Sequence, residues 1–123
     1  MPDTYHGPAA SLALFEALVA TIPEVQLKGA TMPYTSCNGH MFSLLDPSGT
    51  LALRLPKVAL ADFLSRYGTT LSEQYGRVMR EYAVVPPALL ARTDELSEWF
   101  ALSYDWIGTL RPKATTRRAT KPS

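Results

Sequence analysis

The segment from residue 40 to residue 55 constrains the fold of this chain more than any other part of the sequence. Leu51, Leu53 and Leu55 alternate with smaller or polar residues, which is typical of a strand with one buried face. Residues 41–45 form a second short apolar run, and the Asp-Pro-Ser-Gly sequence at 46–49 supplies turn residues between the two runs. The segment therefore predicts a β-hairpin whose apolar face the helices of the chain would cover.

Three segments outside the hairpin predict helices. Before it, Gly7 is an N-cap candidate, Pro8 fits the first helical position, and apolar residues recur every three to four positions up to Pro23. After it, residues 56–68 open with a proline and end with a glycine suited to a helix C-cap. Near the C-terminus, Thr93 is expected to cap a longer helix that ends before Pro112.

Further strands are expected on both sides of the second helix. Residues 31–36 predict a short strand, in which Pro33 favours an edge position or a bulge. Residues 77–85 are rich in β-branched and aromatic residues and predict another strand, with a helix as the alternative. Residues 69–76 are mostly polar and leave a further strand open, and residues 87–90 predict a turn of helix.

The order of these elements predicts the fold class. Strands joined mostly by hairpins, with helices grouped together, are typical of an α+β two-layer sandwich rather than of an alternating parallel fold. We expect an antiparallel sheet of four to five strands with helices packed on one face, in the order α-β-β-β-α-β(β)-α.

Composition predicts one compact domain. A chain of 123 residues, 46% hydrophobic and 19% charged, can bury a core without a disulfide or metal. Cys37 is the only cysteine, so we expect no internal disulfide and a cytoplasmic location. Residues 9–22, the longest apolar segment, are too short to span a bilayer, and no membrane anchor is expected. We expect one domain over residues 1–112 and a disordered basic tail over 113–123.

Charge is distributed unevenly along the chain. Residues 1–110 carry 7 basic and 11 acidic side chains, whereas five cations and no acids follow. An acidic body repels phosphate backbones, so only these cations could contact nucleic acid. The candidate contacts are Arg111, Lys113, Arg117, Arg118 and Lys121.

Three segments resemble a known family. They are 38–45 (NGHMFSLL), 51–56 (LALRLP) and 79–86 (MREYAVVP), followed by a helix that carries tryptophans. In order and spacing, the chain resembles the TfoX N-terminal domain family over roughly residues 10–110. The resemblance implies a small bacterial α+β domain, related in shape to the MmcQ/YjbR proteins, with no catalytic residue and no cofactor. The namesake is a regulator of natural competence, in which a helical domain follows this one, so the present chain is expected to be a stand-alone version.

A cysteine and a histidine lie close together in the sequence. Cys37 and His40 could form a thiolate–imidazolium nucleophile. However, His40 begins a predicted strand, Cys37 lies across a turn from it, and no third orienting residue is evident. We therefore favour a structural, partly exposed thiol. His6 is too distant in sequence to complete a metal site, and no metal is expected.

The C-terminal helix carries the remaining candidate residues. Asp94, Glu95 and Glu98 lie within about one turn and are interpreted as solvated charges that complement the helix dipole. Trp99 and Trp106 are seven residues apart and share a face, which favours core packing over an exposed interface. Phe15, Leu53 and Trp99 are predicted to be core residues.

These observations predict a non-enzymatic regulatory or protein-interaction module without a cofactor. Its protein partner is unknown, and it could form a homodimer. The alternative is a nucleic-acid-associated protein that uses the basic tail, and an enzyme would depend only on Cys37 and His40.

Overall fold

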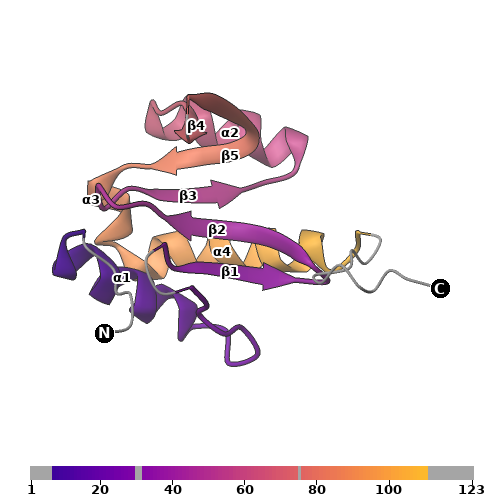
Figure 1. The fold of residues 1–123 in the computed structure, drawn as a ribbon. Coiled ribbons are helices and arrows are strands. Elements are labelled where there is room, and N and C mark those ends of the chain that lie inside the picture. The colour runs from indigo at the N-terminus through magenta and orange to yellow at the C-terminus, as the bar shows by residue number, and fades with distance from the viewer. Residues whose placement is uncertain (1–6, 30–31, 75, 111–123) are drawn as a thin grey trace.

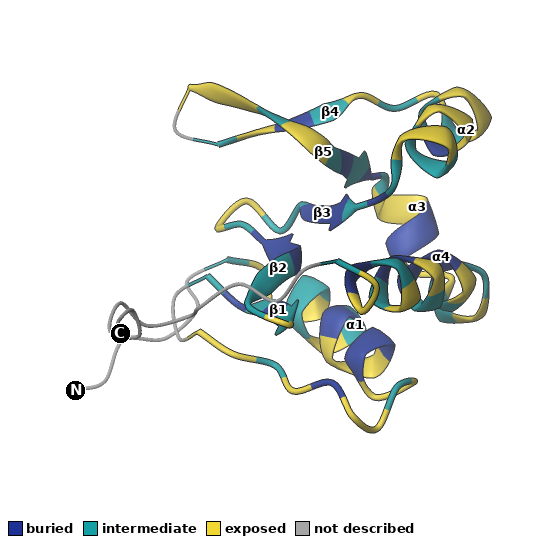
Figure 2. Ribbon diagram, turned by 90° about the vertical axis from the view of Figure 1, so that its right-hand side faces the viewer, coloured by how far each residue is buried: buried dark blue, intermediate teal, exposed yellow. Residues whose placement is uncertain are grey.

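The structure is a computed structural model that describes residues 7–29, 32–74 and 76–110. These residues form a five-stranded antiparallel sheet with the helices on one side of it, as Figures 1 and 2 show. The elements are α1 (Ala9–Val19), β1 (Tyr34–Cys37), β2 (His40–Leu45), β3 (Leu51–Arg54), α2 (Lys57–Tyr67), β4 (Leu71–Gln74), β5 (Arg77–Val85), α3 (Pro87–Leu90) and α4 (Thr93–Ile107). The predicted α+β two-layer sandwich is confirmed. Within the described ranges, no helix is long and apolar enough to cross a membrane.

The predicted hairpin forms the centre of the sheet. The strand order is β1-β2-β3-β5-β4, so β3 pairs with β2 on one side and β5 on the other. Leu53 lies opposite Ser43 of β2 and Ala83 of β5. Directly opposite residues share a face of the sheet, and Leu51 and Leu53 are fully buried in the core. The alternating leucines of β3 therefore point into the helical layer, as their period predicted.

A bulge in β2 directs an aromatic ring into the same layer. Thr35 pairs with Ser43 and Ser36 pairs with Met41, so Phe42 is an extra residue in β2. Such a bulge breaks the alternation of side chains along a strand. Phe42 is fully buried, and its ring lies 5.4 Å from that of Phe100 in α4.

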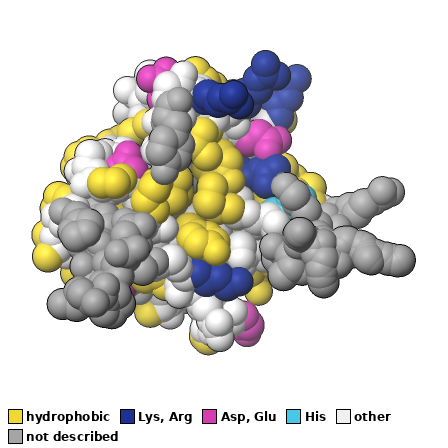
Figure 3. Space-filling model, in the orientation of Figure 1, with side chains coloured by type: hydrophobic (Ala, Val, Ile, Leu, Met, Phe, Trp, Pro, Cys, Tyr) yellow, Lys and Arg dark blue, Asp and Glu magenta, His cyan; other side chains and the backbone are white. Residues whose placement is uncertain are grey.

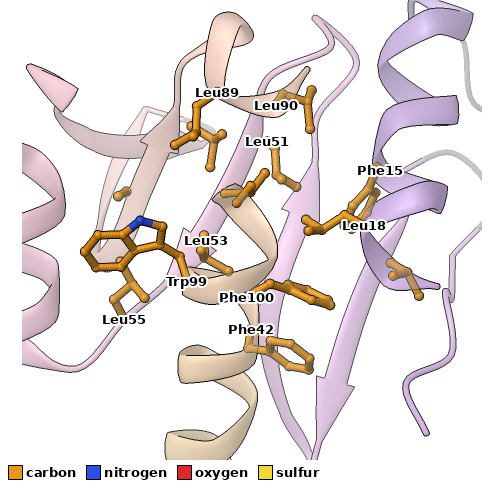
Figure 4. Packing of buried hydrophobic residues seen from close by; sticks show 14 of the residues in the cluster. Phe15, Leu18, Phe42, Leu51, Leu53, Leu55, Leu89, Leu90, Trp99 and Phe100 are labelled. Carbon is orange, nitrogen blue, oxygen red and sulfur yellow. The ribbon is translucent and has the colours of Figure 1, made fainter. Parts of the chain in front are cut away.

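The core lies between the sheet and the helices (Figure 4). Phe15 and Leu53 are completely buried, and Trp99 is 9% exposed, which confirms the three predicted core positions. In Figure 4 the ring of Trp99 lies beside Leu55, apart from the rings of Phe42 and Phe100. This placement leaves one side of the indole near the molecular surface.

The strand after Pro33 forms one edge of the sheet, as the proline favoured. β1 begins at Tyr34, so the predicted start at residue 31 was too early, and residues 30–31 lie outside the described ranges. Pro33 has no N–H to donate, but its carbonyl oxygen accepts a hydrogen bond from Leu45 N at 2.8 Å. Strand pairing therefore ends where the missing N–H would be needed.

Two predicted helix starts are shifted by one residue. Pro8 was expected inside the first helix, but its ψ of 128° is extended and it occupies the cap position, so α1 begins at Ala9. Thr93 was expected to be a cap, but it is the first residue of α4, and Arg92 precedes it without a side-chain capping bond. The predicted C-cap of α2 is confirmed, because Gly68 has a φ of 60°, which glycine adopts without strain.

The strand interpretation of residues 77–85 is confirmed, and the helix alternative is wrong. The preceding polar segment, left open by the sequence, forms β4 at the other edge of the sheet. Leu71 pairs with Ala83 but Ser72 pairs with Met79, so the pairing of these two strands is irregular.

The second face of the sheet carries no helix in the described residues. Figure 3 views this face, and apolar side chains gather near its centre. Leu44, Ala52 and Val84 lie on it in one row of cross-strand partners. Leu44 and Ala52 are nevertheless buried, with exposures of 7% and 1%.

Candidate functional site

An apolar groove lies between α2 and α4. It is shallow and open to solvent, has a volume of about 740 Å³, and is lined by Pro56, Val58, Ala59, Asp62, Trp99, Leu102 and Trp106. Val58 is 83% exposed and Leu102 is 38% exposed, so two large apolar side chains of the same surface face water. We call these seven residues the α2–α4 groove. An apolar concave surface left open to water is typical of a binding site.

Helical periodicity places the α4 wall of the groove. Trp99, Leu102 and Trp106 are separated by three and four residues, so they follow one another along a single stripe of the helix. The ring of Phe63 in α2 meets Trp99 edge-on at 5.1 Å and supports the indole from below. Phe63 is fully buried, so the floor of the groove belongs to the core.

A chain of polar contacts lies at one end of the groove. The Trp99 indole N–H donates to the Tyr67 hydroxyl at 3.0 Å, and that hydroxyl donates to Glu95 Oε2 at 2.5 Å. Glu95 also forms an ion pair with Arg92. Burial, together with the hydrogen bond to Glu95, raises the pKa of Tyr67 above its ordinary value. These groups are already paired with one another, so they are suited to holding α2 against α4.

Arg54 contacts Trp106 at the opposite end of the groove. Its guanidinium carbon lies 5.3 Å from the centre of the Trp106 ring, and it forms an ion pair with Glu81 at 2.6 Å. Ser103 Oγ donates to the carbonyl oxygen of Arg54 at 2.5 Å. A cation over an aromatic face is attractive, so Trp106 is held in place while remaining only partly buried.

The structure brings Cys37 and His40 together. They are cross-strand partners on either side of a two-residue turn, in which Asn38 and Gly39 have φ values of 55° and 78°, as a type I′ turn requires. The Cys37 thiol is partly buried, as predicted, and packs against the core. Neither residue lines the α2–α4 groove.

The other candidates are distributed as follows. Glu95 and Glu98 line a hollow at the polar end of the groove, and Asp94 and Glu95 line another hollow at the start of α4. In the part of the chain that the structure describes, no group of three or more histidine, cysteine or acidic residues could hold a metal ion. The predicted nucleic-acid contacts lie outside the described residues, as does the domain boundary at 112. They are Arg111, Lys113, Arg117, Arg118 and Lys121.

Sequence reasoning missed the groove itself. It identified Trp99 and Trp106 on one face and favoured core packing, and only Trp99 is buried. Val58 and Leu102 were not singled out. The available signal was that each is a large apolar residue at a position of its helix outside the face that packs into the core.

No family model matches the chain, and no curated protein or solved structure matches it either. The assignment of a site therefore depends on the geometry of the described residues.

Proposed function

We propose that this protein is a non-enzymatic interaction module that binds a segment of a protein partner in the α2–α4 groove. The observation that carries the proposal is the exposure of Val58 and Leu102 beside two tryptophans in one concave apolar surface. Burying such side chains against a partner contributes about 1.5–3 kcal/mol for each residue removed from water. Large aromatic side chains in a groove are also frequent anchors of protein interfaces.

The chemistry of the groove favours binding over catalysis. Its polar end is a chain of satisfied contacts, in which Glu95 accepts from Tyr67 and pairs with Arg92. The Glu95 carboxylate is therefore already occupied by contacts within the protein. The apolar part contributes a single ionisable side chain, Asp62, so a paired acid and base is not available along that wall.

The shape expected of a bound segment is an amphipathic helix. An apolar groove between two helices can bind the apolar face of a third helix. The bound helix then places anchoring side chains in the groove at positions i, i+3 or i+4, and i+7. The resemblance to the TfoX N-terminal domain family supports a regulatory role for this contact, and the single cysteine supports a cytoplasmic location. Homodimerisation is the competing way of covering the groove.

A displayed library of amphipathic helical segments, selected on the full chain, tests the proposal. Selected segments should bind the Leu102→Ser and Val58→Ser variants about tenfold more weakly, because one apolar contact is lost. The matched control is Val78→Ser, which alters a 54% exposed valine of β5 outside the groove and should leave binding unchanged. Segments that bind all three variants as tightly as the original chain would contradict the proposal, and so would a selection that enriches nothing.

A further inference from the structure

The polar end of the groove is a hollow in its own right. It encloses about 360 Å³ and is lined by Arg66, Tyr67, Glu95, Glu98, Trp99 and Leu102. Trp99 and Leu102 line the apolar hollow as well, so the two hollows form one continuous groove. A segment bound along α4 would pass from an apolar surface onto a charged one.

Negative charge predominates along this groove. The charged residues that line it are Asp62, Arg66, Glu95 and Glu98. Glu95 is partly neutralised by Arg92. Asp62 and Glu98 form no ion pair with any residue in the described ranges. The whole of α4 contains four acidic residues and no lysine or arginine.

Aromatic faces lie next to these carboxylates. The rings of Tyr67 and Trp99 meet at 6.1 Å in an edge-to-face arrangement beside Glu95 and Glu98. An ammonium or guanidinium group gains from both a carboxylate and an aromatic face. The polar hollow therefore suits a lysine or arginine side chain better than an acidic or purely apolar one, with Arg66 the one opposing charge in its lining.

From this charge and geometry we infer that the partner segment is a basic amphipathic helix. Its apolar face covers the stripe from Trp99 to Trp106, which spans about 10 Å, or two helical turns. A lysine or arginine lies about one turn beyond this apolar face and enters the hollow beside Glu98. The inference depends on the proposed function, because it names the chemistry of the segment that the groove binds.

Two other occupants fit the groove less well. The basic residues after position 110 accompany only alanine, threonine, proline and serine, so this part of the chain has no large apolar side chain to place on Leu102. A second copy bound through the same surface would bring two acidic α4 helices together, and like charges across an interface are unfavourable. A basic segment of another protein satisfies both the apolar and the charged part of the groove.

Fluorescence titration of the full chain tests the inference. Trp99 and Trp106 are the only tryptophans of the protein, so their emission reports on the groove alone. The probes are three synthetic helical peptides without tryptophan that share one leucine stripe and differ only in their flanking residues, which are lysine, glutamine or glutamate. The lysine peptide should bind at least tenfold more tightly than the glutamine peptide, and the glutamate peptide should bind most weakly. The advantage of the lysine peptide should shrink as the salt concentration rises.

A pair of charge-matched variants locates the effect. Glu98→Gln should weaken the lysine peptide about fivefold and leave the glutamine peptide unchanged. Glu73→Gln removes the same charge from an exposed position in β4, outside the groove, and should change neither.

The possible outcomes separate this inference from the proposed function. If all three peptides bind equally and Leu102→Ser weakens all of them, the groove binds apolar helices but the charge inference is overturned. If none binds, and light scattering shows a dimer that Leu102→Ser dissociates, the occupant is a second copy and the inference is overturned as well. If none binds and the chain is monomeric, both the inference and the proposed function fail.

Discussion

The indole N–H of Trp99 donates to the hydroxyl of Tyr67 at 3.0 Å, which connects α4 to α2 at the polar end of the groove. The two residues are 32 positions apart in the chain, and the same hydroxyl donates to Glu95 one turn earlier in α4. One side chain of α2 is thus bonded twice to α4. These bonds fix the separation of the two helices and, with it, the width of the groove.

Tyr67→Phe should therefore destabilise the protein. The variant keeps the ring contacts with Phe63 and Trp99 but leaves the indole N–H without its acceptor. We expect a loss of about 1–2 kcal/mol in the free energy of unfolding, measured by chemical denaturation. Tyr34→Phe is the matched control, because no hydrogen bond of the Tyr34 hydroxyl is found among the described residues. Equal losses for the two variants would show that the Tyr67 hydroxyl is not a structural link.

Leu53→Ala tests the core beneath the sheet. Leu53 is fully buried at the centre of β3, between β2 and β5. Removing its side-chain atoms leaves a cavity that the packed surroundings fill only in part, so we expect a loss of about 2–5 kcal/mol in the free energy of unfolding. Val78→Ala, at a 54% exposed position, should lose much less. A loss below about 1 kcal/mol for Leu53→Ala would be inconsistent with its position in the core.

A buried pair of hydroxyls next to the β2 bulge predicts strong coupling. Thr35 Oγ1 and Ser43 Oγ are 2.5 Å apart, and both residues are completely buried. Ser43→Ala leaves the Thr35 hydroxyl without a partner, which should cost about 1–3 kcal/mol. The double variant Thr35→Val/Ser43→Ala removes both hydroxyls and should be less destabilised than the sum of the single variants by about 1 kcal/mol or more. Additive losses in a double-mutant cycle would argue against the bond.

The raised pKa of Tyr82 predicts that the folded protein loses stability at high pH. Burial is the main reason that its pKa rises from 10.0 to about 12, and its hydroxyl donates to the carbonyl oxygen of Met41 at 2.6 Å. Above pH 10 the unfolded chain releases the phenolic proton while the folded chain keeps it, so stability is complete below pH 10 and falls as the pH rises toward 12. For this residue the fall should be about 2–3 kcal/mol at most.

Tyr82→Phe provides the comparison for this pH dependence. The free energy of unfolding of both proteins would be measured at pH 9 and pH 11, where the other tyrosines contribute equally to each. The variant should be less stable at pH 9, because it lacks the bond to Met41, and the difference should narrow at pH 11. A difference that stays constant between the two pH values would contradict the raised pKa.

Local signals in the sequence predicted much of the fold. The leucine alternation in β3 gave its buried face, Pro33 gave the edge position of β1, and Gly68 gave the end of α2. Each of these features depends on a residue and its immediate neighbours, because backbone dihedral preferences and side-chain period act over a few positions. The start of α4 was misplaced by one residue because Thr93 fits either a cap or a first turn.

The parts that the sequence could not predict depend on residues far apart in the chain. Phe42 enters the helical layer only because β1 and β2 pair with a bulge, and β4, with mostly polar residues, forms a strand because β5 lies beside it. The groove likewise exists only because α2 and α4 come together through Tyr67 and Trp99. In the sequence, Val58 and Leu102 look like ordinary surface residues. They form one apolar surface only when those two helices lie side by side.

The positions of the two indole N–H resonances in a ¹H–¹⁵N correlation spectrum of the full chain test most directly whether the α2–α4 groove is the interaction surface. Both tryptophans of the protein line the groove, so their indole signals report its occupation without further labelling. On titration with the lysine-flanked peptide, both signals should shift together and saturate, and Leu102→Ser should abolish the shifts at the same concentrations while Val78→Ser preserves them. Saturable binding that leaves both indole signals in place and shifts the amides of β2, β3 and β5 would contradict the account and assign the contact to the opposite face of the sheet.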